Sequence, residues 1–541
     1  MAKVMDASEA AASSSDHGVG TTADVEKGSF LSRLKGQRID LDELGKQYYQ
    51  QSLQYDEEQL KRDAIKVRRK LDFLVLPLMA TTYMLSFLDK QTLNYSNAYG
   101  LQEDTHMKGN DYAWVSSALY FGWLTGSYPW QLLLQRFPIG RLIGVMLFFW
   151  GATCMLQATV YNFSGFVAIR FFLGMFEAVV SPAFVLLTSM LWTREEQSLR
   201  TSYWLSVDGM ASIIGALLAY GVGHVHHVAV APWRLIYLIV GAMTFAWGFV
   251  IFLYLPDGPH NVKALSEYER VVAVWRISQN QTGLKHNKIV PGQIKEALLD
   301  PKSWLLFLIA VCVGMLNGGT TNFLSAIIAG FGYSPLKTSL LQTPVGAFEL
   351  VLCIVFGYLS ELPNFFGITI MRKCFALFCV LFLKQSADVS VSCLPGLVGL
   401  IGILTIPFSH RFALVIMCWF QGVIGSPLVL NWTVPGLNTA GHTKRTTVLG
   451  VYFIFFCSGN IIGPHLFLAS EKPRYQTAIK SLVGAYAAVI GLQAIYTTYC
   501  WMENRAKARA GLLDGVSKSE VALEGFDDLT DKQNKHFRYR I

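Results

Sequence analysis

The chain has 541 residues, of which 52% are hydrophobic and only 15% are charged, whereas about a quarter of the residues in a soluble domain carry charge. Most of the charged residues lie in three segments, residues 1–70, 256–303 and 502–541. The two long blocks between them, residues 71–255 and 304–501, hold only 17 and 14 charged residues. Neither block has enough charge to cover a water-soluble domain, so the composition excludes a soluble protein and predicts an integral membrane protein.

Each block contains apolar runs of about 20 residues, the length that crosses a membrane as a helix. The six runs of the first block are residues 71–95, 112–135, 140–160, 164–190, 201–223 and 234–255. The second block contains residues 304–329, 338–360, 411–433, 447–469 and 481–501, together with a less regular region at 366–407. We therefore predict an all-α membrane protein with 12 transmembrane helices in two halves of six, joined by the central loop 256–303. This is the plan of transporters that are built from two repeated halves.

The region at residues 366–407 holds two apolar runs, Phe375–Leu383 and Leu394–Ile406, where a plan of 12 helices has room for one. Counting both runs gives 13 spans and places the two ends of the chain on opposite sides of the membrane. We interpret the region as a single span with an insertion near residues 374–392, of the kind that an unspliced intron would produce.

Lysine and arginine residues near the span ends predict the orientation of the chain. In the short loops, the counts on the two sides are equal, with Lys90 counted among the eight basic residues of the outer loops. The tie is broken by the clusters that flank the membrane region: Lys66, Arg68, Arg69 and Lys70 before it, and Arg505, Lys507 and Arg509 after it. We therefore expect both tails to lie in the cytoplasm. Separately, we expect the membrane to be the plasma membrane. The first tail, residues 1–70, reads as mostly disordered, and the second is residues 502–541.

No cofactor, metal or nucleic acid is expected. The chain contains no GxxxxGK[ST] loop that would hold a nucleotide, so transport would depend on a solute or ion gradient. The nine cysteines lie mostly inside apolar runs, and we expect them to be small buried hydrophobic residues. The cluster His224, His226 and His227 reads as an exposed loop more than as a metal site. The basic residues lie beside spans, which does not suggest nucleic acid, and we expect a monomer.

Charged side chains inside a membrane span are costly and are therefore functional candidates. Arg170 and Glu177 lie seven residues apart in one predicted span, so both project from the same face, about 10 Å apart along the axis. We expect this face to line a central cavity. There the planar fork of Arg170 suits a substrate carboxylate, and Glu177 suits proton coupling. The alternative is a structural ion pair that holds helices together.

Three further acidic residues lie in predicted spans. Asp89 is either a proton-coupling group or an interfacial cap beside Lys90. Asp208 either pairs with Arg170 or helps to relay protons. Glu349 has no basic residue at a similar depth in its span, and we include it among the proton-coupling candidates.

Two amide side chains of the second half, Asn317 and Gln421, are candidates for substrate contact. The alternative for both is hydrogen bonding between helices, which is the usual role of amides in membrane spans.

The membrane region, about residues 70–505, resembles the major facilitator superfamily and, more closely, its fungal anion:cation symporters, the allantoate permease group. The segments that carry the resemblance are Leu88–Tyr95, Arg170–Ala178 with Pro182, Trp192–Gln197, Pro232–Arg234, Phe331–Ser334, Leu340–Pro344 and Gly459–Pro464. The chain departs from the family in two places. The inner loop Gln135–Arg141 keeps its basic residues without the usual acid, and the ninth span follows the family only from about Leu394.

The resemblance implies alternating access and proton-driven uptake of a small organic anion such as allantoate, ureidosuccinate, nicotinate or another carboxylate vitamin. In related symporters, the residues at the positions of Arg170 and Glu177 serve anion binding and proton coupling. Two alternatives remain open: an exporter of a secondary metabolite on the same fold, and a nutrient sensor that does not transport. An enzyme is not expected, because the sequence shows no nucleophile–base pair and no metal constellation.

Overall fold

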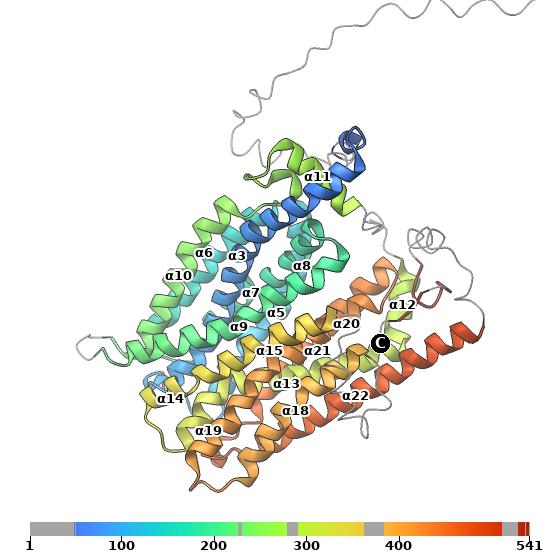
Figure 1. Ribbon diagram of the computed structural model, residues 1–541. Coiled ribbons are helices and arrows are strands. Elements are labelled where there is room, and N and C mark those ends of the chain that lie inside the picture. Colours follow the sequence, from blue (N-terminus) through green and yellow to red (C-terminus); the bar gives the residue numbers. More distant parts are fainter. Residues whose placement is uncertain are drawn as a thin grey trace, which may run out of the picture.

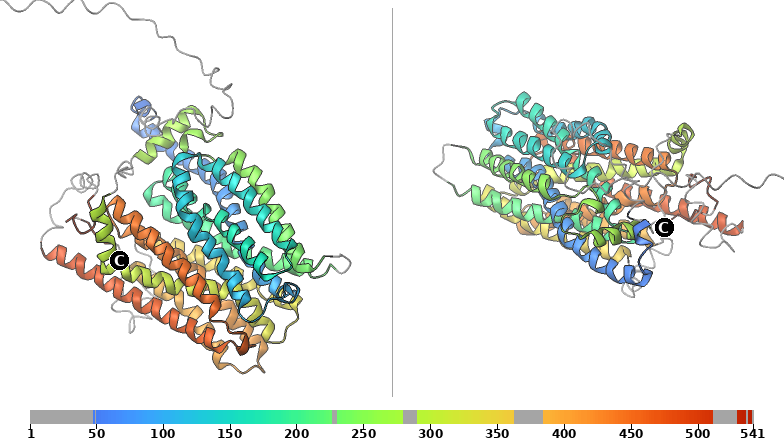
Figure 2. Two further views of the ribbon diagram at one scale, coloured as in Figure 1. Left: turned by 180° about the vertical axis from the view of Figure 1, so that it is seen from behind. Right: turned by 90° about the horizontal axis from the view of Figure 1, so that it is seen from above.

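The computed structural model describes residues 48, 50–225, 230–278, 290–361, 384–510, 529–535 and 537–539. Throughout this part of the chain the regular elements are helices, and they form two bundles that lie side by side (Figures 1 and 2). Residues 1–47, His226, His227 and the run Phe375–Leu383 lie outside the described residues.

The first bundle contains six helical segments at the places where the first six spans are predicted. They are α3 (Glu57–Asn97), α5 (Asp111–Arg136), α6 (Ile139–Leu156), the pair α7 (Phe163–Glu177) and α8 (Val180–Leu191), α9 (Arg194–Val222) and α10 (Pro232–Tyr254). The short helix α4 (Leu101–Asp104) connects α3 to α5.

The second bundle also contains six segments, several of them broken. They are α13 (Pro301–Gly330), the pair α14 (Pro335–Leu341) and α15 (Thr343–Glu361), α18 (Lys384–Thr405), the run of α19 (Arg411–Trp419), η4 (Phe420–Ile424) and α20 (Gly425–Leu437), α21 (His442–His465) and α22 (Gln476–Arg509).

Nine helical stretches in the described part of the chain are long and apolar enough to cross a membrane on their own. The other three predicted spans correspond to α5, which is long, and to the shorter apolar helices of α18 and of α19 with η4. The prediction of an all-α membrane protein is therefore confirmed.

The described part of the ninth span is helix α18. Helix α18 starts at Lys384 and continues to Thr405, so residues 384–392 form its first turns. Residues 374–383, the rest of the suggested insertion, lie outside the described residues. The insertion stays a prediction.

Glycines bring neighbouring helices into backbone contact within each bundle. A Cβ atom on Gly174 of α7 would lie 2.0 Å from the backbone oxygen of Leu119 in α5, and one on Gly459 of α21 would lie 2.1 Å from that of Val311 in α13. Such close approach provides the packing that holds membrane helices together, because lipid tails are as apolar as the helix surfaces and leave little hydrophobic driving force.

The two bundles touch through a similar contact between α9 and α15. A Cβ on Gly209 would lie 2.4 Å from the backbone oxygen of Gly346, and a Cβ on Gly346 would lie 2.4 Å from that of Gly209. In Figure 1 the bundles lie close together towards α14 and diverge towards α11 (Glu267–Ser278) and α12 (Pro291–Leu299). One end of the molecule is thus closed between the bundles and the other is splayed.

At the splayed end, α11 packs on the first part of α3. The Tyr268 hydroxyl donates to Asp63 of α3 at 3.0 Å, and Lys70 of α3 pairs with Glu269. On another side of α11, Arg276 pairs with Glu196 at the start of α9, at 2.6 Å. These contacts explain why α3 begins at Glu57, well before the predicted span at residue 71. Its charged first turns form a helix that packs against the central loop instead of entering the apolar part of the bundle.

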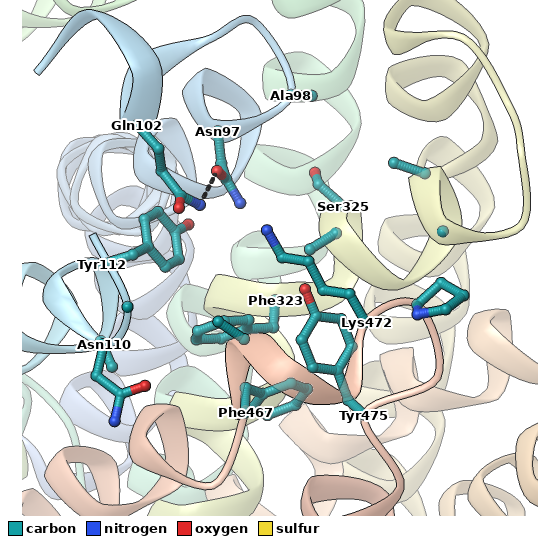
Figure 3. Close-up of a pocket in the computed structure, with 17 residues that line it drawn as sticks. Asn97, Ala98, Gln102, Asn110, Tyr112, Phe323, Ser325, Phe467, Lys472 and Tyr475 are labelled. Carbon is teal, nitrogen blue, oxygen red and sulfur yellow. Dashed lines mark hydrogen bonds between the residues drawn. The ribbon is translucent and has the colours of Figure 1, made fainter. Parts of the chain in front are cut away.

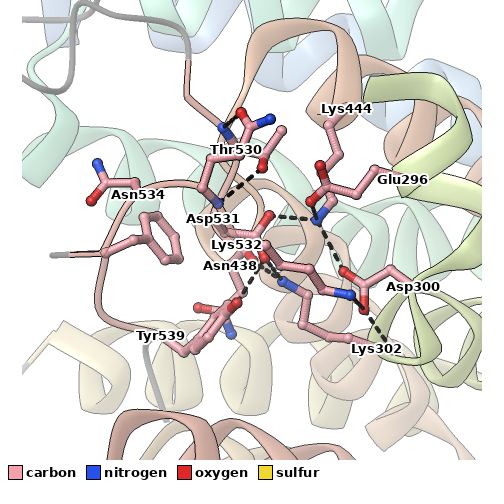
Figure 4. Close-up of polar contacts among 12 residues, drawn as sticks. Glu296, Asp300, Lys302, Asn438, Lys444, Thr530, Asp531, Lys532, Asn534 and Tyr539 are labelled. Carbon is pink, nitrogen blue, oxygen red and sulfur yellow. Dashed lines mark hydrogen bonds and ion pairs between the residues drawn. The ribbon is translucent and has the colours of Figure 1, made fainter. Parts of the chain in front are cut away.

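The end of the chain docks at the same end of the molecule, against the second bundle (Figure 4). Asp531 is fully buried and contacts Lys302 at 2.5 Å and Lys444 at 2.8 Å, while Lys444 also pairs with Asp300 at 3.0 Å. The Tyr539 hydroxyl donates to Asp531 at 2.8 Å. Burial by itself raises the pKa of Asp531, but the charges of Lys302 and Lys444 lower it to about 2.

We expect Asp531→Asn to release the tail from the second bundle, because breaking a buried ion pair costs about 3–5 kcal/mol. Hydrogen exchange of the amides at residues 529–539 would then accelerate strongly. Because the pKa of Asp531 is lower in the docked state than in the free tail, docking should be stable above about pH 4 and weaken as the pH falls towards 2. Lys532→Gln serves as the control. Its exposed ion pair with Asp300 should contribute about 1 kcal/mol or less, and equal exchange in both variants would contradict the role of Asp531.

Candidate functional site

A pocket lies between the two bundles near the middle of the helices. Its walls come from α3, α5, α8 and α9 of the first bundle and from α13, α20 and α21 of the second. A pocket lined by both halves at mid-depth is where transporters of this plan bind their solute.

Half of the residues that line the pocket are aromatic. Trp123 of α5 stacks on Phe453 of α21, with ring centroids 5.8 Å apart, and therefore joins the two bundles. Trp432 of α20 meets Phe456 edge to face at 5.3 Å. Such a wall favours a ligand with apolar or flat parts, and the few polar groups that face it would set the orientation of the ligand.

Lys90 and Asp208 are the charged residues among those that line the pocket. The ammonium group of Lys90 lies 3.0 Å from a carboxylate oxygen of Glu177 and 4.2 Å from the ring centre of Trp123. Its side chain is 12% exposed, whereas that of Glu177 is 1% exposed. The lysine thus stands between the pocket and a fully buried acid.

Glu177 is held by three groups from two other helices. Besides Lys90, the Trp123 indole nitrogen donates to it at 3.2 Å and the Ser86 hydroxyl donates to it. Ser86 and Lys90 lie four residues apart on α3, so one face of that helix presents both. Glu177 is the last residue of α7, directly before the break that separates α7 from α8.

Arg170 lies away from this pocket. It is 2% exposed, is not among the lining residues, and donates to the Tyr237 hydroxyl of α10 at 3.0 Å. The expectation that Arg170 and Glu177 line one cavity is therefore not met, because the Arg170 side chain meets α10 inside the first bundle.

Asp89 belongs to the same internal cluster as Arg170. Its carboxylate accepts from the Trp150 indole nitrogen at 2.8 Å and from the Cys154 thiol at 3.1 Å. Cys154 also contacts the backbone oxygen of Tyr237, the residue to which Arg170 donates. Asp89 is fully buried, so its interpretation as an interfacial cap is wrong. Adjacent residues of α3, Asp89 and Lys90, thus serve two separate polar clusters.

The two predicted amides have different surroundings. Asn317 lines the pocket and donates to the side-chain oxygen of Asn460 at 2.8 Å. Gln421 is buried, donates to the backbone oxygen of Gly396 at 2.9 Å and is not among the lining residues. Asn317 therefore remains placed for substrate contact, whereas the contacts of Gln421 match the alternative of bonding between helices.

The remaining acids, Asp208 and Glu349, lie on α9 and α15, next to the Gly209–Gly346 contact. Asp208 faces the pocket, and its Oδ1 atom is buried with no hydrogen-bond partner among the described residues. Glu349 is 6% exposed and faces α20, where a Cβ on Gly425 would lie 2.8 Å from its carboxylate oxygen. No ion pair between Asp208 and Arg170 is present in the described part of the chain.

Sequence reasoning missed Lys90 as a site residue because it counted this lysine among the charges of an outer loop. The sequence did offer a signal, because Lys90 lies inside the predicted span 71–95. The structure continues that helix to Asn97. Its partner Glu177 lies on another helix, and no pattern in the sequence joins the two.

A hydrogen-bonded seal joins the bundles at the end opposite α11 and α12. The Asn94 side chain of α3 donates to Gln342 at 2.8 Å and accepts from the Ser325 backbone nitrogen at 3.0 Å, and Gln342 donates to the Ser325 hydroxyl at 2.8 Å. Nearby, the Tyr112 hydroxyl of α5 donates to the Asn322 backbone oxygen at 2.9 Å. We call Asn94, Tyr112, Asn322, Ser325 and Gln342 the polar seal.

Two six-helix halves with a pocket between them at mid-depth define a class of multi-pass membrane transporters. Residues 79–464 match the Major Facilitator Superfamily, and the chain belongs to this superfamily. It is 33% identical to the allantoate permease of Saccharomyces cerevisiae, over 88% of this chain and 86% of that protein, and 30% identical to the thiamine pathway transporter of the same yeast, over the same shares. The resemblance to the allantoate permease group is thereby confirmed.

A solved structure supports the fold. The crystal structure of a bacterial homologue of the human lysosomal transporter Spinster, in an inward-facing and unoccupied conformation, matches with a TM-score of 0.54. The match covers 80% of this chain and 96% of that chain at 13% sequence identity.

We expect Asn94→Ala to loosen the polar seal and to populate a state in which this end is open. The variant loses two hydrogen bonds between the bundles, each contributing about 0.5–1.5 kcal/mol, so the ratio of open to closed protein should rise about 5- to 150-fold. Pulsed electron resonance between spin labels on K108C and Q476C, both exposed at this end, would detect the longer distance. Asn97→Ala is the matched control, because Asn97 bonds to Gln102 of the same bundle. An unchanged distance distribution in the Asn94 variant would remove the seal from the gating of this end.

Proposed function

We propose that the protein takes up a small organic anion together with a proton, by alternating access at the plasma membrane, with both tails in the cytoplasm. The observation that carries the proposal is the ion pair between Lys90 and Glu177, in which a cation at the pocket is neutralised by a buried acid. The allantoate permease relative supports a carboxylate substrate.

The ion pair provides a way to couple the two solutes. While Glu177 is ionised, Lys90 is already paired, and a substrate carboxylate would bring a net negative charge into an apolar pocket. When Glu177 takes up a proton, Lys90 loses its partner, and the substrate carboxylate can replace it. In both states the positive charge has one anionic partner, which keeps the cost of burying charge low.

Other polar residues support this step in the proposal. Asp89 bonds α3 to α6 and so positions the turn that carries Lys90, while Arg170 bonds α7 to α10. Asn317 offers a hydrogen bond to the substrate from the second half. Asp208 and Glu349 are further proton-carrying groups at the contact between the bundles, and Gln421 keeps a structural role.

Uptake of radiolabelled allantoate, nicotinate, pantothenate and simple dicarboxylates, compared at acidic and neutral external pH, tests the proposal. We expect one of these anions to accumulate faster at acidic pH, and a protonophore to abolish the accumulation. Uptake that does not depend on pH would contradict proton coupling. Net efflux of every anion from loaded vesicles would favour the exporter.

We expect Glu177→Gln to separate binding from coupling. The neutral amide resembles the protonated acid, so Lys90 stays available, exchange of substrate across the membrane persists, and accumulation driven by the pH gradient is lost. Full concentrative uptake in this variant would contradict the coupling role of Glu177.

We expect Lys90→Met to lower substrate affinity at least tenfold, because hydrogen bonds to charged groups contribute about 1.5–3 kcal/mol. Lys90→Arg should retain much of that affinity. Arg170→Lys tests the other cation, because it keeps the charge and loses the planar fork. If substrate affinity falls tenfold in Arg170→Lys and stays normal in Lys90→Met, the carboxylate binds at Arg170 and not at Lys90. Affinities are measured as the substrate concentration that gives half-maximal exchange.

A further inference from the structure

A second pocket lies at the sealed end of the molecule, away from the central one. It has a volume of about 280 Å³. One wall comes from the first bundle and includes Asn97, Gln102 and Tyr112, and the other comes from the second bundle and includes Phe323, Lys472 and Tyr475 (Figure 3). The central pocket shares none of these residues.

The floor of this pocket is aromatic. Phe323 of α13 stacks on Phe467 after α21, with ring centroids 4.2 Å apart and planes 12° from parallel. The ring of Tyr475 lies edge-on to Phe467 at 5.5 Å, and that of Tyr112 lies edge-on to Phe323 at 5.1 Å. Aromatic groups arranged this way favour a flat ligand, because offset and edge contacts add to its burial.

The rim of the pocket is polar and positive. Among the described residues that line the pocket, Lys472 alone carries charge, and no ion pair holds its ammonium group in the described part of the chain. In Figure 3 its side chain extends across the opening towards Asn97, whose amide oxygen accepts from Gln102 at 2.6 Å. An unpaired cation beside amides is suited to a carboxylate.

The pocket also depends on the conformation of the protein. Tyr112 and Ser325 belong both to this pocket and to the polar seal, so the two walls stay together only while the seal is closed. A ligand that bridges the walls binds the closed state better than the open one, and therefore shifts the population towards the closed state.

We propose that this pocket is an inhibitory site for small flat organic anions, such as aromatic carboxylates. With the carboxylate at Lys472 and the ring on Phe323 and Phe467, a bound anion would hold the sealed end closed and slow the return of the transporter to its open state. The proposal rests on the proposed function only in taking the sealed end to face the outside of the cell.

Binding of benzoate to the purified full-length protein, by isothermal titration, tests the site without any need for the transported substrate. We expect Lys472→Gln to weaken benzoate binding at least tenfold, and Lys480→Gln, an exposed lysine at the same end that does not line the pocket, to leave it unchanged. Benzamide, which lacks the charge, and cyclohexanecarboxylate, which lacks the flat ring, should bind more weakly than benzoate.

Hydrogen exchange separates this site from the central one. Benzoate should slow exchange in both walls, at residues 97–113 and 467–475, and should do so equally in Lys90→Met. Protection that survives Lys472→Gln, or that is lost in Lys90→Met, would overturn the proposal and place benzoate in the central pocket. If the protein transports none of the anions but shows this pattern of benzoate binding and protection, the proposed function is contradicted and the benzoate site stands.

Discussion

The structure depends on one electrostatic constraint: a charge inside the apolar bundle is far less costly when it has a partner than when it is isolated. The first bundle meets this constraint twice on adjacent residues of α3. Asp89 is held by Trp150 and Cys154 beside Arg170, and Lys90 is held by Glu177. The two clusters differ in one respect. The first is enclosed by the helices of its own bundle, whereas the second borders the pocket, where a solute can compete for the lysine.

The same α3 continues from this site to the polar seal. Four residues after Lys90, Asn94 bonds to Gln342 and to the backbone of Ser325 in the other bundle. One helix therefore carries the cation of the central pocket, the main contact of the polar seal and, at Asn97, part of the wall of the second pocket. Because Lys90 and Asn94 lie on one continuous helix, a movement of Lys90 when its charge partner changes is passed directly to the polar seal. In this arrangement the site and the gate share a structural element.

The sequence was sufficient to predict the membrane fold, because the positions of the charged segments and the lengths of the apolar runs can be read from it directly. The predicted span at residues 234–255, for example, matches α10 at Pro232–Tyr254. The site was predicted less well. Helical periodicity places Arg170 and Glu177 on one face, but the partner of each comes from another helix: Tyr237, 67 residues away, for Arg170, and Lys90 for Glu177. Contacts between helices distant in sequence leave no periodic pattern, which is why Lys90 was assigned to a loop.

The contact between Gly209 and Gly346 has a mechanical consequence. At the polar seal and at the Trp123–Phe453 pair, the two bundles meet through side chains and directional hydrogen bonds, which must break when the bundles separate. At this pair the backbones meet with no side chains between them, so one helix can turn on the other without interlocked groups having to disengage. It therefore has the properties of a fulcrum: a small rotation here becomes a larger displacement at the distant ends of α9 and α15. Asp208 and Glu349 sit beside this pivot, where the lever arm is shortest and their surroundings change least as the ends swing.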